Sequence, residues 1–455
     1  MSLFSLFSYA GLHCVIIDGF SKGAGYRPGA KLQGQAFRNQ WTAVNVEGSW
    51  RFINCNWGAR HVKGPNDQAL TYKCDEFYFL TDAEDHIYQH FPDDQQWQLL
   101  KKPISIEEFG RLPVTKSPFY NKRLHFSYRY DAILKASDGV TEVRLVMPKL
   151  MGFAAKLHNK EKKIPDDVLT ERVLVRAIDN EVAVSVNLPM PGVYYLDIFV
   201  ESDWRKNQMD HACAFAIRCT DISKDAHVSF PQLGMYGRTA LLKGMGLIED
   251  EAHKDPYLSC RQQITIPFTL APRENVRLSH TLQMWSYRDR ELQDHDRFAL
   301  LRHRNTDTAS FTVTCPQKGH YVFSILAEDG ASEHGPELVY RYLVDCRVAA
   351  QDARQFPRAS KRWQHCKLIE PLQGDLPLEA QVVFRIESEV ATEIVVVIHG
   401  VWNALQNQNG LFQGVISTGK QQGKAIIYAK FGGGKAKYIP CLEYNILSLR
   451  KYSFV

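Results

Sequence analysis

One internal repeat constrains the fold of this chain more than any other feature of its sequence. The pattern P-x-x-G-x-Y-x-x-x-I occurs at residues 189–198 and again at residues 316–325. Cys219 and Cys346 are as many residues apart as the two copies of the pattern, so there is no net insertion between the copies. A Pro-containing turn closed by Gly leads into a strand whose Tyr and Ile share one face, because their spacing is even. This arrangement is typical of a β-sandwich.

The repeat predicts that residues 180–219 and 307–346 form the same strands of two sandwiches, with Tyr194 equivalent to Tyr321. A weaker third copy, without the Pro, occupies residues 423–428. Other short segments alternate as half-buried strands do, and they lie at residues 143–146, 182–186, 264–268 and 394–398.

Breaks in the strand pattern divide the chain into four predicted parts. They fall at residues 112–118, 220–231 and 351–358. Long helical patterns are absent after about residue 110. We therefore predict a mixed α+β domain at residues 1–112, followed by mainly-β sandwiches at residues 116–222, 228–350 and 356–455.

Composition excludes several classes of protein. A chain of 455 residues is long enough for about three domains, and 45% hydrophobic with 23% charged residues is the composition of a folded protein. The net charge of +5 is small and scattered, which argues against binding to nucleic acid or to an anionic membrane. Ten cysteines without a C-x-x-C pair, mostly inside apolar runs, favour a reducing cytoplasm over a secreted disulfide scaffold.

The start of the chain, from Met1 to Ile17, carries no charge, but no Lys or Arg precedes its apolar part and serines interrupt it. We therefore predict neither a signal peptide nor a membrane span. Residues 3–10 follow helical spacing, Gly11 ends that helix, and residues 14–17 are typical of a buried strand.

A predicted hairpin at residues 41–54 has its turn at Glu47 and Gly48. Asn39 precedes the first strand and Asn54 ends the second, so the two amides should lie close together, within reach of a hydrogen bond. Three tryptophans cluster on this hairpin and on the segment after it, and we assign them to the core.

The order of strand, Gly-rich loop, hairpin and Trp-Gly resembles the second half of a transglutaminase-like core, the papain-related fold with a Cys-His-Asp triad. The closest variety is the kyphoscoliosis peptidase and hillarin group of cytoskeletal proteins, whose domain continues much like residues 77–82, 90–93 and 97–100. The resemblance covers about residues 3–110. It implies an N-terminally truncated transglutaminase-like half-domain, immunoglobulin-like sandwiches after it, and cytoskeletal protein partners. Truncation should leave an exposed apolar patch beside the first helix.

The departures from the family pattern concern its catalytic residues. Asn39 stands at the position of the His in His-x-Trp-x-x-Val, with Trp41 kept. Asn54 stands at the position of the Asp in Asp-x-x-Trp-Gly, with Trp57 and Gly58 kept. The nucleophilic Cys would precede Met1. An amide cannot accept the proton of a thiol near pH 7, so we predict a degenerate triad without catalytic residues, that is, a pseudoenzyme.

Other chemistry has weaker support. A replacement trio is disfavoured. Cys14 lies in a buried-strand pattern, and Cys55 follows the position of the family's Asp, where small core residues are expected. Cys74 with His61 or His86 remains, but a chance Cys-His pair is much commoner than a triad and residues 61–65 are typical of an exposed loop. Residues 294–296 with His303 could hold a metal, but their mixed charges are typical of a solvated face. Glycines at 23–25 and 431–435 indicate loops rather than phosphate sites. We expect no metal and no cofactor.

These observations predict a cytoplasmic, cytoskeleton-associated scaffold or interaction protein. One alternative is a cysteine peptidase or protein cross-linking enzyme whose nucleophile lies upstream in a longer form. A carbohydrate-binding sandwich protein is a third possibility, which would need exposed aromatic residues on one sheet face and a secretion signal.

Overall fold

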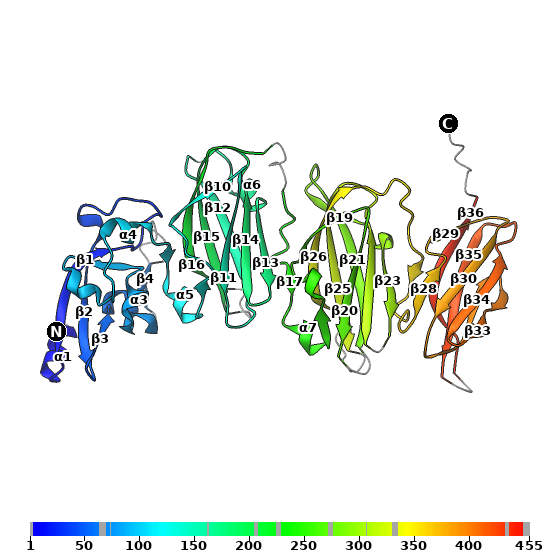
Figure 1. The fold of residues 1–455 in the computed structure, drawn as a ribbon, viewed down its shortest axis with the longest axis horizontal. Helices are drawn as coiled ribbons and strands as arrows, with labels where there is room; N and C mark the ends of the chain where they lie inside the picture. The colour runs from blue at the N-terminus through cyan, green and yellow to red at the C-terminus, as the bar shows by residue number, and fades with distance from the viewer. Residues whose placement is uncertain are drawn as a thin grey trace. The chain divides into compact units, whose positions relative to one another are not determined.

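The computed structural model consists mainly of β-sandwiches (Figure 1). It describes residues 3–62, 70–72, 74–161, 163–203, 208–223, 229–271, 276–305, 307–329, 335–432 and 436–448. The chain divides into two compact units, residues 1–235 and 236–455. No helix in the described part of the chain is long and apolar enough to cross a membrane.

A five-stranded antiparallel sheet forms the first domain of the first unit. Its strand order is β6-β3-β2-β1-β7, with bounds Phe79–Thr81, Ser49–Ile53, Arg38–Val46, Cys14–Ser21 and His90–Pro92. A separate ladder joins β4 (Arg60–Val62) to β5 (Leu70–Tyr72). The helices around the sheet are short, and they are α1 (Leu3–Tyr9), α2 (Cys55–Ala59), α3 (Ala83–His86) and α4 (Ile106–Arg111).

The predicted hairpin is confirmed. Strands β2 and β3 pair from Thr42–Ile53 to Val46–Ser49, and both turn residues have positive φ, 53° at Glu47 and 82° at Gly48. Two successive positive φ angles match the right-handed twist of a two-residue hairpin, which Gly at the second position permits. One detail was wrong: β2 begins at Arg38, so Asn39 lies inside the strand instead of before it.

The predicted helix is also present as α1, and Gly11 follows it with φ 76°. The expectation of a buried strand after it was wrong in part, because Ile16 of β1 is 45% exposed. Exposed and buried side chains alternate in the middle of β1, so one face of the strand is open to solvent. Together with Leu6, Tyr9 and Leu12, Ile16 provides the exposed apolar side chains expected near α1.

Sandwich 1 completes the first unit. One sheet contains β10 (Ile133–Ala136), β16 (Gln208–Cys219), β15 (Gly192–Asp203) and β12 (Phe153–Asn159), with β8 (Val114–Thr115) also on β16. The other contains β13 (Val173–Ile178), β14 (Glu181–Asn187), β11 (Val140–Val146) and β9 (His125–Phe126). Helices α5 (Ser117–Asn121) and α6 (Asp166–Thr170) are single turns. Leu145 and Val184 of one sheet share a core with Leu196 and Phe215 of the other.

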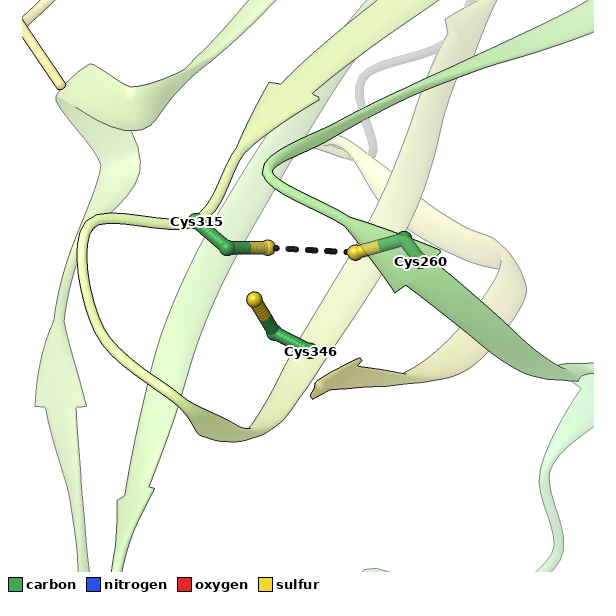
Figure 2. Close-up of side chains that lie close together, drawn as sticks. All are labelled: Cys260, Cys315 and Cys346. Carbon is green, nitrogen blue, oxygen red and sulfur yellow. Dashed lines mark hydrogen bonds between the residues drawn. The ribbon is translucent and has the colours of Figure 1, made fainter. Parts of the chain in front are cut away.

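Sandwich 2 opens the second unit. Its first sheet contains β22 (Glu291–Asp294), β21 (Val276–Ser286), β25 (Gly319–Asp329), β26 (Glu337–Val348) and β19 (Tyr257–Arg261), with β17 (Gly237–Arg238) also on β26. Its second contains β20 (Gln263–Leu270), β24 (Thr308–Thr314) and β23 (Ala299–Arg304), with β18 (Leu247–Glu249) on β20 and α7 (Leu241–Gly244) nearby in sequence. Strand β19 runs parallel to β26 and brings Cys260 opposite Cys346 (Figure 2).

The repeat is confirmed. Strands β14 and β15 of sandwich 1 precede β24 and β25 of sandwich 2 by the same separation as the two copies of the pattern. Gly192 pairs with Cys219 as Gly319 pairs with Cys346. Each predicted Tyr is fully buried, and its hydroxyl donates to the carbonyl four residues earlier at 2.9 Å, Tyr194 to Met190 and Tyr321 to Gln317.

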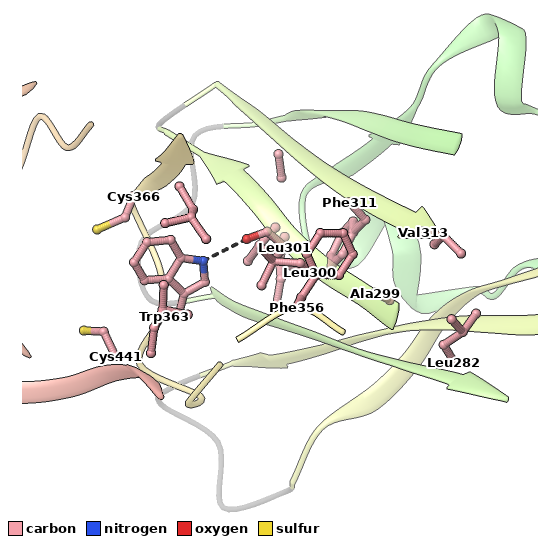
Figure 3. Close-up of a cluster of buried hydrophobic side chains, with 14 of the residues drawn as sticks. Leu282, Ala299, Leu300, Leu301, Phe311, Val313, Phe356, Trp363, Cys366 and Cys441 are labelled. Atoms are coloured by element: carbon pink, nitrogen blue, oxygen red, sulfur yellow. Dashed lines mark hydrogen bonds between the residues drawn. The ribbon is translucent and has the colours of Figure 1, made fainter. Parts of the chain in front are cut away.

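Sandwich 3 packs on sandwich 2 within the second unit. Its sheets are β28-β30-β34-β33 (Lys367–Glu370, Gln381–Glu387, Leu411–Ser417, Gln406–Gln408) and β27-β36-β35-β31-β32 (Arg358–Ala359, Ile439–Leu447, Gly423–Phe431, Ala391–Ile398, Val401–Ala404), with β29 (Asp375–Pro377) on β36. The β23–β28 pair extends one sheet across both sandwiches. The Trp363 indole N–H donates to the Leu301 carbonyl at 2.8 Å, inside a core that continues from one sandwich into the other (Figure 3).

The third copy of the repeat is only partial. Gly423 starts β35 opposite Ile446, but Ala425 takes the place of the buried Tyr, and Tyr428 lies three residues further along. The breaks between domains remain predictions, although residues 114–115, expected in a linker, form β8 in sandwich 1. Residues 433–435 of the expected glycine turn lie outside the described residues.

Candidate functional site

Asn39 lies on β2 opposite Gly19 of β1. Its Oδ1 accepts a hydrogen bond from the Gln40 backbone N–H at 2.8 Å, and its buried Nδ2 has no partner among the described residues. Gly19 allows close packing at this point, because a Cβ there would collide with the Phe91 carbonyl oxygen and the Trp41 ring. Trp41, two residues after Asn39, is therefore held against β1 and is buried, as predicted.

Asn54 follows β3 and is only 2% exposed. Its Oδ1 accepts a hydrogen bond from the Trp57 backbone N–H at 3.1 Å, and its Nδ2 lies 3.0 Å from Nε2 of His90 on β7. Because the Trp57 contact fixes which end of the amide is the oxygen, Nδ2 donates to His90 Nε2, and the proton of the neutral imidazole belongs on Nδ1. The pairing predicted between the two asparagines is replaced by an Asn54–His90 pair.

Strand register explains why the two amides do not meet. Thr42 pairs with Ile53, so Trp41 is the residue opposite Asn54. Asn39 is two residues further along β2, which is about 7 Å at the usual rise of a strand. Asn54 therefore faces the aromatic cluster around Trp41, and the nearest hydrogen-bonding side chain in that cluster is His90.

His90 is buried among aromatic rings. Its ring centroid lies 4.5 Å from that of Trp57, 5.0 Å from that of Trp41 and 4.2 Å from that of His86, on which it stacks. Burial lowers the pKa of His90 to about 3. Burial, and then repulsion from His90, lowers the pKa of His86 well below its usual range. Both imidazoles are therefore neutral near pH 7.

His90 is the site residue that our sequence reasoning missed. We used it only as part of the stretch 90–93 that carries the family resemblance. A polar residue at the start of an otherwise apolar strand was the available signal, but nothing local indicates that β7 pairs with β1, which places His90 opposite Ser21 beside the hairpin.

Among the described side chains, neither Cys55 nor Cys74 is part of a triad. Cys14 pairs with Val44, five residues along the β1–β2 ladder from Asn39, a separation of about 17 Å. Cys55 begins α2 and is exposed, and desolvation raises the pKa of its thiol, which is the wrong direction for a nucleophile. Neither Cys55 nor the exposed Cys74 has a histidine partner in the part of the chain that the structure describes.

Of the two histidines of that alternative, His61 differs from expectation. His61 lies in β4 rather than in a loop, and its side chain and residues 63–65 are outside the described residues. His86 stacks on Phe52 at 4.2 Å and faces the core.

The residues considered and disfavoured as a metal site, 294–296 with His303, form local hydrogen bonds. Asp296 accepts from the Leu282 N–H at 2.7 Å, His295 Nδ1 lies 3.1 Å from the Gln293 carbonyl, and His303 Nε2 lies 3.2 Å from the Thr308 hydroxyl. Among the described residues, the side chains that lie close enough together to hold a metal ion are three cysteines, Cys260, Cys315 and Cys346.

Sequence comparison places this fold in a family. The family described as KY-like, immunoglobulin-like domain matches residues 106–231 and 244–357, which together exceed half of the chain. The chain belongs to the kyphoscoliosis peptidase and hillarin group. It is 33% identical over 359 residues to Hillarin of Drosophila melanogaster, covering 72% of this chain and 43% of that protein. It is 30% identical over 371 residues to Lim and transglutaminase domain protein ltd-1 of Caenorhabditis elegans, covering 75% and 50%.

The human relative matches over a longer stretch than these two. Kyphoscoliosis peptidase of Homo sapiens is 26% identical over 411 residues, covering 90% of this chain and 60% of that protein. The chain thus spans 43% to 60% of the length of these relatives. Membership of the group and the immunoglobulin-like sandwiches agree with the resemblance drawn from residues 3–110.

Proposed function

We propose that this protein is a non-catalytic, cytoplasmic scaffold or interaction protein of the cytoskeleton, built on a degenerate transglutaminase-like domain at residues 1–112. The observation that carries this proposal is the Asn54–His90 hydrogen bond, in which an amide occupies the position of the family's catalytic Asp. A carboxylate there would orient a histidine and stabilise its cation, whereas an amide that donates to Nε2 favours the neutral ring.

The chemistry of the site argues against activation of a thiol. Asn39, at the position of the family's base, has an amide side chain that does not take up a proton at neutral pH. His90 has its Nε2 lone pair engaged with Asn54 and its Nδ1 protonated. A base must be within hydrogen-bond reach of the thiol that it deprotonates, and no described histidine is hydrogen-bonded to Cys55 or Cys74.

Partners are inferred from the family and from one exposed surface. The resemblance to the kyphoscoliosis peptidase and hillarin group implies cytoskeletal proteins as partners. On sandwich 3, Trp402 of β32 is 54% exposed, and its ring centroid lies 5.4 Å from that of Tyr428 and 5.2 Å from that of Tyr438. Exposed Trp and Tyr are the residues that most often dominate protein interfaces, so we assign the binding face to this aromatic cluster.

The same cluster favours a second candidate function. Aromatic rings on the face of a sheet also stack on sugars, and the carbohydrate-binding alternative requires such a surface. The enzyme alternative draws instead on the names of the relatives, which include a peptidase and a transglutaminase domain protein.

One set of assays separates these three functions. The purified chain is assayed for peptide hydrolysis and for amine incorporation into protein, with and without iodoacetamide, and is sedimented with filamentous actin. We expect no turnover, also in the Asn39→His/Asn54→Asp variant, and sedimentation with filaments that Trp402→Ala reduces. Turnover abolished by alkylation of one mapped cysteine would establish the enzyme instead. Binding to a glycan array that Trp402→Ala abolishes, without filament binding, would establish the carbohydrate-binding function.

A further inference from the structure

Three buried cysteines meet at one end of sandwich 2. Cys260 comes from β19, Cys315 follows β24, and Cys346 lies in β26, with exposed fractions of 6%, 0% and 2%. Their sulfur atoms all lie within 4.8 Å of one another, and the Sγ atoms of Cys260 and Cys315 are 3.6 Å apart. Figure 2 shows the three side chains pointing toward a common centre from three segments of the chain.

Backbone pairing fixes this convergence. Cys260 is the direct partner of Cys346 in the parallel β19–β26 ladder. The Cys315 N–H donates to the Gln262 carbonyl at 2.7 Å, and the Cys315 carbonyl accepts from the Ala350 N–H at 2.9 Å. These bonds hold Cys315 between the segments that follow β19 and β26. The three sulfur atoms are therefore brought together by the fold itself.

The fold does not require three thiols here, as sandwich 1 demonstrates. There the parallel β10–β16 ladder pairs Ala136 with Cys219, where sandwich 2 pairs Cys260 with Cys346. Leu188 directly follows β14 as Cys315 directly follows the equivalent strand β24. Sandwich 1 thus fills the same buried place with Ala, Leu and one Cys.

Sandwich 3 also lacks a thiol at one of these positions. Ile446 pairs with Gly423, which starts β35, as Cys346 pairs with Gly319, which starts β25. Ile446 is fully buried in the core of its own sandwich. In sandwich 3 the aliphatic side chain of Ile446 therefore occupies the position that corresponds to Cys346.

We propose that Cys260, Cys315 and Cys346 bind a thiophilic d10 cation, Cu⁺ or Zn²⁺, through three thiolate sulfur atoms. Thiolates are the ligands that select these two metals among those of the cell. A Zn–S bond of about 2.3 Å places the sulfurs of a tetrahedral site about 3.8 Å apart. The spacing of the three sulfurs fits this geometry, with one pair at 3.6 Å and all pairs within 4.8 Å.

The two ions differ in the number of ligands that they need in addition to the three sulfurs. Cu⁺ is satisfied by three sulfurs, whereas Zn²⁺ takes a fourth ligand, which would be a water molecule. No other His, Cys, Asp or Glu of the described residues joins the cluster, so the protein itself supplies three ligands. For either metal each thiol that becomes a ligand releases one proton to solvent, so binding of one ion as a trithiolate releases three protons.

The test uses the full chain, reduced and free of metal, in the absence of oxygen. Cu⁺ is titrated against bicinchoninate and Zn²⁺ against a chromogenic chelator. We expect one equivalent of one of these ions to be retained per chain against the competitor. The Cys260→Ala/Cys315→Leu variant, which reproduces the residues of sandwich 1, should lose that equivalent. Cys219→Ala is the matched control, because it removes the single thiol of sandwich 1, and it should retain the full equivalent.

X-ray absorption of the loaded, unmutated chain gives an independent measurement that needs no variant. It should count three sulfur neighbours at about 2.3 Å for either metal. If the double variant fails to fold, Cys346→Ile, the residue of sandwich 3, replaces it in the titration. The proposal is overturned if the unmutated chain retains neither ion, if the folded variants retain as much metal as the unmutated chain, or if the metal has mainly nitrogen and oxygen neighbours.

Discussion

A single amide fixes the tautomer of the buried imidazole beside the hairpin. Asn54 can only donate to His90 Nε2, because the Trp57 N–H occupies its oxygen. A carboxylate at the same place would accept a hydrogen bond from a protonated Nε2 instead and would favour the imidazolium. The geometry of an Asp–His pair is therefore present at residues 54 and 90, with a neutral amide in place of the carboxylate.

We accordingly predict that Asn54→Asp raises the pKa of His90 by about 1–3 pH units, since a carboxylate in contact stabilises the charged ring. The measurement is an NMR pH titration of the histidine ring protons. Asn39→Asp is the control, because Asn39 is not hydrogen-bonded to His90, and it should change that pKa far less. An unchanged His90 titration in a folded Asn54→Asp protein would contradict the assigned contact.

The pKa values of His86 and His90 also predict how stability depends on pH. Both are lowered in the folded state, so between about pH 6.5 and the folded pKa the unfolded chain binds more protons than the folded chain. The free energy of unfolding therefore falls as pH decreases from about 6.5 toward 3, by up to about 1.4 kcal/mol per pH unit for each histidine. Urea unfolding between pH 7 and pH 4 measures this slope. His86→Phe should flatten it, and an equal slope in that variant would exclude His86 as a cause.

Among the elements, the repeated strand with its buried Tyr has the clearest consequence for stability. We predict that Tyr194→Phe and Tyr321→Phe each lower the free energy of unfolding by about 0.5–1.5 kcal/mol, because the hydrogen bond to the carbonyl of Met190 or Gln317 is lost. Tyr428→Phe is the matched control from the partial third copy, since the Tyr428 hydroxyl has no hydrogen-bond partner among the described residues. It should change stability by less than about 0.5 kcal/mol. A Tyr428 effect as large as the other two would remove the distinction between the copies.

Elements determined by neighbouring residues were predictable from the sequence, and contacts determined by distant ones were not. Glu47 and Gly48 indicate their own turn, and the P-x-x-G-x-Y pattern indicates a strand with a buried Tyr, because turn and strand preferences act over a few residues. The Asn54–His90 pair depends on β7 joining β1, and the three-cysteine cluster depends on β19 running parallel to β26. Cys260 and Cys346 are far apart along the chain, and no short spacing motif records that they meet.

At the scale of the whole molecule, the buried cores do not follow the four predicted parts. Sandwich 1 has its own core, whereas one continuous core runs through sandwiches 2 and 3. The β23–β28 pair and the segment around Trp363 join the two sandwiches of the second unit. Breaks in the strand pattern predicted the four parts, but such breaks carry no information on whether neighbouring domains share a core. We infer that residues 236–455 unfold as one cooperative unit.

Trp363→Ala tests this inference. The substitution removes a ring that is 2% exposed and the hydrogen bond to Leu301, so it should cost about 3–5 kcal/mol. Because the ring lies in the shared core, the loss should lower the unfolding temperature of sandwiches 2 and 3 together and leave residues 1–235 unchanged. Hydrogen exchange followed by mass spectrometry resolves the two units, and the exposed Trp402→Ala serves as control, with an expected change within about 0.5 kcal/mol. Faster exchange confined to sandwich 3 would mean that the continuous core does not couple the two sandwiches, and faster exchange in residues 1–235 would mean that cooperativity extends beyond the second unit.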